Sequence, residues 1–189
     1  MTRRVKGMFL AGVMAAALTT ATPALAGPPL LCFPFDIGAA RSLPIGHGSW
    51  RAIDRGYDVS RLVDDTVALF APETPVLVRM ETLRRATLYA GERPEIATAL
   101  LARLRDRAKA PAAGGIDAGL AVFDFGYLVE TIRQAEPIFK KRIAAIDGID
   151  GYQFVLKARA LRSDASMDYP ARLIAGTVSP HVTASPHQP

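Results

Sequence analysis

His47, Ser49 and Asp54 are the residues whose types and spacing come nearest to a catalytic set. His47 lies between two glycines, and Ser49 follows two positions later. An imidazole beside a hydroxyl can act as general base for a nucleophile, and a carboxylate can orient the imidazole. No acid stands at a spacing that defines such a triad. A small hydrolase using these three residues is therefore the alternative hypothesis, and an ordinary exposed loop histidine is the interpretation we favour.

The sequence lacks the motifs of the commoner catalytic and metal sites. It has no Gly-rich phosphate loop, no Gly-x-Ser-x-Gly turn and no pair of histidines at helical metal-ligand spacing. The remaining histidines, His181 and His187, lie in a polar C-terminal stretch, where we expect them to be solvated. We expect no cofactor and no metal site, and we favour a protein without catalytic activity.

Asp124 is the polar residue that is hardest to explain as ordinary surface. Its neighbours three and four positions away are apolar or aromatic: Leu120, Ala121, Tyr127 and Leu128. A helix would therefore present the Asp124 carboxylate on an apolar face, where burial raises the pKa of the carboxyl unless a cation meets it. We expect an ion pair with Arg84 or Arg85. The second interpretation is a binding site formed by Asp124, Tyr127, Arg84 and Arg85.

Cys32 is the only cysteine, so the chain can form no internal disulfide and holds no cysteine-based zinc or redox motif. Free cysteines are among the most often buried residues, and the surrounding segment from Leu30 to Phe35 is apolar. We therefore expect Cys32 to pack under the helices. An intermolecular disulfide is the other interpretation.

The first 26 residues have the three parts of a secretory signal peptide. Three cations give a basic start, an apolar run of about 11 residues extends from Met8 to Leu18, and a small-residue site ends at Ala26. The apolar run is shorter than the ~20 residues that a membrane-spanning helix needs. We expect cleavage after Ala26, a periplasmic or secreted location, and no stable membrane anchor after cleavage.

The rest of the chain is close to neutral. The formal net charge is +5, but the residues after position 26 comprise 20 basic and 18 acidic ones, a net charge of +2. This balance does not favour nucleic acid or an anionic membrane as a partner. The basic run Lys140-Lys141-Arg142 and the cations between Arg103 and Lys109 are typical of helix ends, where cations interact favourably with the helix dipole.

Proline, glycine and the spacing of apolar residues predict the elements that must position these side chains. Residues 27–59 are rich in Gly, Pro and aromatic residues, which predicts an extended arm with at most a short helix over 50–55. Helical periodicity predicts a domain over 60–175, and residues 176–189 are typical of a disordered tail. The helices expected in the domain span 60–71, 75–90, 92–109, 118–135, 137–146, 150–161 and 164–175.

The predicted fold class is all-α, because no segment shows sustained period-two alternation. A connection of about two residues between the second and third helices, and another at Arg162-Ser163, predict antiparallel hairpins. We expect stacked antiparallel helical hairpins, about six or seven helices in all, with an extended N-terminal arm. Leu83 and Leu100 are expected on the inward faces of the first hairpin.

One stretch of the sequence has the spacing found in the first helix of a tetratricopeptide repeat. In that pattern a large residue is followed three positions later by a large residue and a glycine, and then by a third large residue; here these are Val122, Phe125, Gly126 and Val129. Over this one helix the chain resembles the tetratricopeptide-like helical-hairpin proteins. The expected hairpins begin at intervals of 43 and 32 residues, whereas that family has a period of about 34. The resemblance implies packed helix pairs and a peptide-binding groove.

Two hypotheses of different classes follow from these observations. The favoured one is an exported, non-catalytic helical protein that binds a protein or peptide through a groove between hairpins. The alternative is a small periplasmic or secreted hydrolase, and a third is a structural packing unit without a ligand. Because catalysis requires hydrogen-bond reach, the positions of His47, Ser49 and Asp54 in the fold discriminate between the first two.

Overall fold

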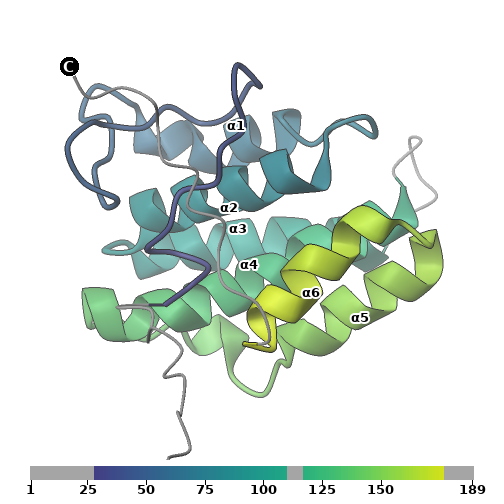
Figure 1. Cartoon of the computed structure of the whole chain (residues 1–189). Coiled ribbons are helices and arrows are strands. Elements are labelled where there is room, and N and C mark those ends of the chain that lie inside the picture. Colours follow the sequence, from purple (N-terminus) through teal and green to yellow (C-terminus); the bar gives the residue numbers. More distant parts are fainter. Residues whose placement is uncertain (1–27, 110–116, 177–189) are drawn as a thin grey trace, which may run out of the picture.

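The computed structural model describes residues 28–109 and 117–176, and within these ranges all regular structure is helical (Figure 1). The six α-helices are α1 Leu62–Ala68, α2 Val76–Ala90, α3 Pro94–Lys109, α4 Ala118–Phe139, α5 Gly151–Arg162 and α6 Asp168–Ile174. Three 3-10 turns accompany them: η1 Val59–Arg61, η2 Ala144–Ile146 and η3 Ala165–Met167. The predicted all-α fold class is confirmed. The predicted signal peptide, 1–26, and the predicted tail beyond residue 176 lie outside the described residues.

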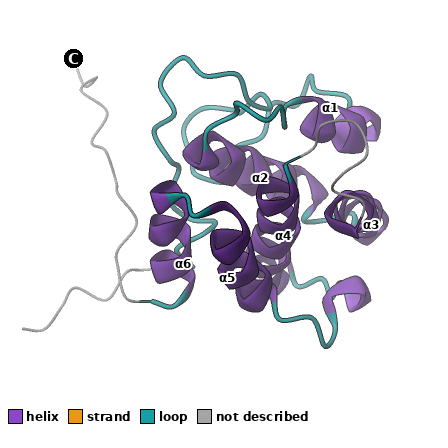
Figure 2. Cartoon of the chain, turned by 90° about the vertical axis from the view of Figure 1, so that its right-hand side faces the viewer, coloured by secondary structure: helices purple, strands orange, loops and turns teal. Residues whose placement is uncertain are grey.

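α4 forms the centre of the domain because its residues 118–129 are apolar on every side except at Asp124. Every residue from Gly119 to Val129 is buried, and α2, α3 and α5 pack around this helix (Figure 2). A helix that is hydrophobic all round is stable only inside a shell of other elements. Asp117 is the N-cap of this helix, since its side chain accepts the backbone N–H of Leu120 at 2.8 Å.

The other helices are arranged around α4. α2 and α3 are joined by the three residues 91–93 and pack more extensively against α4 than against each other, while α6 packs on α5. Leu83 in α2 and Leu100 in α3 are both fully buried, which confirms their predicted core positions. No helix within the described ranges is long and apolar enough to cross a membrane.

The predicted helix over 137–146 is wrong. α4 continues through Pro137 to Phe139 and ends at Lys140, whose φ of 54° is left-handed, and only η2 follows before α5. Phe139 packs with Leu31 and Leu88 in a small apolar cluster, and this burial keeps the last turn helical despite the N–H that proline lacks. The short helix considered for 50–55 is also absent, because these residues form turns and irregular backbone.

The N-terminal arm, residues 28–58, has no helix and crosses the helices of the domain (Figure 1). Its buried apolar side chains belong to the core: Leu30, Leu31, Phe35 and Leu43. The irregular backbone of the arm leaves carbonyl oxygens without a backbone N–H donor. Side chains of α2 donate hydrogen bonds to several of these oxygens. Arg84 donates to the carbonyl oxygens of Leu31 and Trp50 at 3.1 Å each, and Arg85 donates to that of Leu43 at 2.6 Å.

Candidate functional site

Asp124 is fully buried between α4 and α2, and its ion-pair partner is Arg79. The distance from Arg79 Nη1 to Asp124 Oδ2 is 2.6 Å, and both side chains are at most 2% exposed. The burial of Asp124 agrees with the prediction, but the predicted partners, Arg84 and Arg85, are wrong. Arg84 lies about 1.4 turns beyond Arg79 along α2, so it faces a different part of the structure.

The Asp124–Arg79 pair stabilises the turn between α1 and α2. Arg79 also donates to two carbonyl oxygens of this turn, and its guanidinium lies 5.1 Å from the centre of the Phe70 ring. Burial raises the pKa of Asp124 to about 6, although the positive charges of Arg79 and Arg107 act in the opposite direction. This carboxylate is therefore part of the interior and is not exposed to a ligand.

Arg84 and Arg85 share a different carboxylate, that of Glu81. Their Nε atoms lie 2.7 Å from the two Glu81 oxygens, and Glu81 also accepts the backbone N–H of Phe35 at 3.0 Å. Tyr127 is buried as well; desolvation, and then the charge of Glu81, raise the pKa of its hydroxyl well above the usual range. Asp124 thus belongs to one buried ion-pair network and Arg84 and Arg85 to another, while the buried Tyr127 hydroxyl has no hydrogen-bond partner within the described residues.

His47, Ser49 and Asp54 lie in exposed parts of the arm. The Ser49 hydroxyl accepts the backbone N–H of Arg51 at 3.3 Å, and the Asp54 carboxylate accepts that of Gly56 at 2.8 Å, as is usual in turns. Among the described residues no hydrogen bond joins His47 to Ser49 or to Asp54. The structure therefore does not bring these residues together as a catalytic set.

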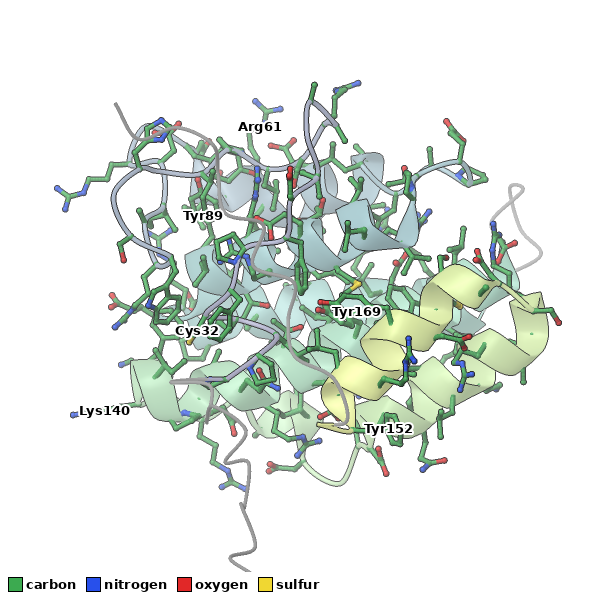
Figure 3. The ribbon with its side chains drawn as sticks, in the orientation of Figure 1. Cys32, Arg61, Tyr89, Lys140, Tyr152 and Tyr169 are labelled. Atoms are coloured by element: carbon green, nitrogen blue, oxygen red, sulfur yellow. The ribbon has the colours of Figure 1, made fainter. Side chains whose placement is uncertain are left out.

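Cys32 is a free, partly buried thiol on the arm, and burial raises its pKa. Figure 3 shows it on the side of the molecule away from Tyr152 of α5. The adjacent residue Leu31 is fully buried, so the apolar segment does pack on the helices as expected. Within the described ranges no group of three or more His, Cys, Asp or Glu residues could hold a metal ion.

A groove of about 870 Å³ lies between α3, α4 and α5, and we call it the α3–α4–α5 groove. Its volume falls within the range of about 300–1,000 Å³ that is common for ligand sites. Figure 2 shows α3 and α5 on either side of α4, whose residues form the floor. The apolar side chains that line the groove are Ala108, Ala118, Val122, Phe125, Ile149, Phe154 and Leu161.

The floor of the groove is firmly packed, whereas one wall is exposed. Phe125 is 1% exposed and meets Phe154 edge to face, with ring centres 4.9 Å apart. Leu161 on α5 is 53% exposed, more than any other large hydrophobic residue in the described part of the chain. A concave, mostly apolar surface with a few charged groups is the usual form of a binding site.

Arg105, Lys109 and Lys157 place three positive charges around this apolar floor. The Arg105 guanidinium lies 5.5 Å from the centre of the Phe125 ring and donates to the carbonyl oxygen of Ala145 at 3.4 Å. These contacts hold Arg105 over the floor. The groove also contains Asp150, whose carboxylate accepts the backbone N–H of Gln153 at 3.1 Å as the N-cap of α5.

Sequence reasoning missed this groove. From the sequence alone, the helix dipole explains the cations of α3. In the structure these cations have different surroundings. Arg107 donates to the carbonyl oxygen of Phe70, whereas Arg105 and Lys109 line the groove. The available signal was spacing, because Arg105 and Lys109 are four residues apart and so share a helix face. The spacing of residues within α3 does not show which face of α5 lies across the groove from Arg105 and Lys109.

Comparisons of the chain with protein-family models, with curated proteins and with solved structures found no match. The functional argument therefore rests on the chemistry of the groove. Its lining in the described structure contains no His, Ser, Thr or Cys side chain, the residue types that most often act as nucleophile or neutral-pH base. What the lining offers is an apolar surface with charged groups at its edges, which suits binding.

Proposed function

We propose that the chain is an exported, non-catalytic protein that binds a peptide segment of a protein partner in the α3–α4–α5 groove. The observation that carries the proposal is the exposed side chain of Leu161 beside the packed floor of Phe125 and Phe154. Export is supported by the signal-like pattern of the first 26 residues.

An apolar peptide side chain gains free energy by covering Leu161. Full burial of a Leu-sized or Phe-sized side chain contributes about 1.5–3 kcal/mol, and the groove offers this on a surface that is already formed. The floor need not be ordered on binding, because Phe125 is fixed within α4 and packs edge to face with Phe154. Preorganisation of this kind lowers the entropic cost of association.

The proposal is tested by selecting peptides from a random 12-residue library on the purified protein and measuring their Kd by fluorescence anisotropy. Leu161→Ser should weaken binding about tenfold, equivalent to about 1.4 kcal/mol, because it removes the exposed apolar wall. Leu77→Ser is the matched control, since Leu77 is 37% exposed on α2 and does not line the groove. The control should bind like the wild type.

Two results would contradict the proposal. One is a selection that yields no peptide with a measurable Kd. The other is a set of peptides that bind the wild type, Leu161→Ser and Leu77→Ser equally well. Circular dichroism of both variants verifies that a change in Kd does not come from a loss of helical structure.

A further inference from the structure

The geometry points to a peptide partner that is acidic, with carboxylates on both sides of its apolar side chains. This inference rests on the proposed function and names the chemistry of the partner. It starts from the charges around the groove. Arg105 and Lys109 come from α3, and Lys157 comes from α5, so positive charge lies on two different helices that border one apolar floor.

In the described part of the chain the groove cations have no acidic partner within ion-pair distance. Among the described residues Arg105, Lys109 and Lys157 take part in no ion pair, although Arg159 and Arg162 on the same helix as Lys157 pair with aspartates. All 18 acidic side chains of the sequence lie in the described ranges, so none elsewhere in the chain can neutralise them. These three cations are therefore available to pair with carboxylates of a partner.

The spacing of these charges favours a peptide over a small amphiphile with one anionic group. Arg105 and Lys109 are four residues apart, about 6 Å along α3, and Lys157 lies on a separate helix. Cations on two helices can engage two or more carboxylates at once, and an amphiphile with one anionic group supplies only one. A peptide lying in the groove can place its apolar side chains against the floor and direct an acidic side chain towards each helix.

Asp150 gives one end of the groove a negative charge, so the two ends differ in electrostatic potential. It begins α5, and Lys157 lies seven residues later, about 10 Å along the helix. A carboxylate of the partner is repelled near Asp150 and attracted near Lys157. We therefore expect the acidic residues of the peptide near the Lys157 end of the groove and its uncharged residues near Asp150.

Three synthetic 12-residue peptides test the inference by titration calorimetry. Each has Leu at positions 2, 5, 6 and 9, and the other positions carry either Glu and Ala, Gln and Ala, or Lys and Ala. The Glu peptide should bind roughly five- to tenfold more tightly than the Gln peptide, as expected for two or three partly exposed charge pairs. The Lys peptide should bind most weakly. The advantage of the Glu peptide should decrease between low salt and about 0.3 M salt, because screening weakens exposed pairs.

The double variant Lys109→Gln/Lys157→Gln should remove most of the advantage of the Glu peptide over the Gln peptide. The matched control is Lys140→Gln/Lys141→Gln, which removes two exposed cations that do not line the groove. This control should retain the wild-type preference. Because all four lysines are exposed, both double variants are expected to fold.

The outcomes separate this inference from the proposed function. If the Glu and Gln peptides bind the wild type with equal Kd, and both bind Leu161→Ser more weakly, the inference of an acidic partner is wrong. The proposal of peptide binding in the groove then still stands. Failure of every peptide to bind overturns the proposed function. Dodecanoate serves as the probe for a small amphiphile, and if it binds while no peptide displaces it, the occupant is a lipid-like anion and the inference is wrong.

Discussion

Charged side chains of α2 are buried because they complete the hydrogen bonds of irregular backbone. Arg79, Glu81 and Arg84 are each only 1% exposed, and every one of them contacts both an opposite charge and a backbone group. A buried charge without such partners would cost several kcal/mol. The α2 charges therefore hold the N-terminal arm and the α1–α2 turn in place.

Asp124→Ala should lower the free energy of unfolding by about 3–5 kcal/mol, since it leaves the Arg79 guanidinium buried without its counter-charge. Adding Arg79→Leu should recover part of that loss. Chemical denaturation of the wild type, both single variants and the double variant gives the coupling energy between the two residues.

Arg85 provides the control for this cycle. It pairs with Glu81, so Asp124→Ala and Arg85→Leu should be additive within about 0.5 kcal/mol. A coupling of Asp124 with Arg79 below that value would show that the ion pair does not stabilise the fold.

The sequence predicts the burial of Asp124 but not its partner. Burial follows from neighbours on the same helix, three and four residues away, which are readable from the sequence. The choice between Arg79, Arg84 and Arg85 depends on how far α2 is shifted along α4, and that shift results from the packing of many side chains. The same limit applies to Arg105 and Lys157, which only the assembled fold brings to one groove.

At the scale of the elements, close contact between α4 and α5 depends on glycine. A Cβ on Gly126 would lie 2.5 Å from Phe154 Cβ and 2.7 Å from the carbonyl oxygen of Gly151. Gly91 has a similar role at the end of α2, where a Cβ would lie 2.4 Å from the Phe139 ring. The φ of Gly91 is −58°, so a close contact, not a left-handed cap, requires glycine there.

The start of α4 was predicted correctly, whereas its end was not. Asp117 and Asp150 cap α4 and α5, and such capping bonds are local in sequence. The end of α4 was predicted too early, since Pro137 normally marks a boundary and the burial of Phe139 is a tertiary effect. The resemblance of α4 to a tetratricopeptide helix stays a prediction.

Gly126→Ala should destabilise the protein by about 1–3 kcal/mol, because backbone and a Cβ atom of α5 must move to accommodate the added methyl group. Gly56→Ala is the control. A Cβ there would meet only the flexible Asp54 side chain, at 3.3 Å, so the expected change is within about 0.5 kcal/mol. Thermal melts compare the two variants, and equal melting temperatures would exclude a tight α4–α5 contact at Gly126.

At the scale of the whole molecule, α4 separates two regions with different roles. Asp124 and Tyr127 lie on the side of α4 that meets the buried charges of α2, whereas Val122 and Phe125 lie on the side that forms the groove floor. The first side is closed by α2 and the arm, and the second is left partly open between α3 and α5. The arm is therefore part of the folded core, which limits where the chain can be cut.

The predicted cleavage after Ala26 is compatible with this core. Leu30 and Leu31 are fully buried, the Leu30 N–H donates to Gln134 at 2.8 Å, and the Leu31 carbonyl accepts from Arg84 at 3.1 Å. A cut after Ala26 preserves all of these contacts, whereas removal of the chain up to Cys32 would empty two core positions and cost about 2–5 kcal/mol at each. Mass spectrometry of exported protein should therefore find Gly27 at the N-terminus. A mature chain that begins at Cys32, with or without a lipid, would show both the cleavage site and the role assigned to Leu30 and Leu31 to be wrong.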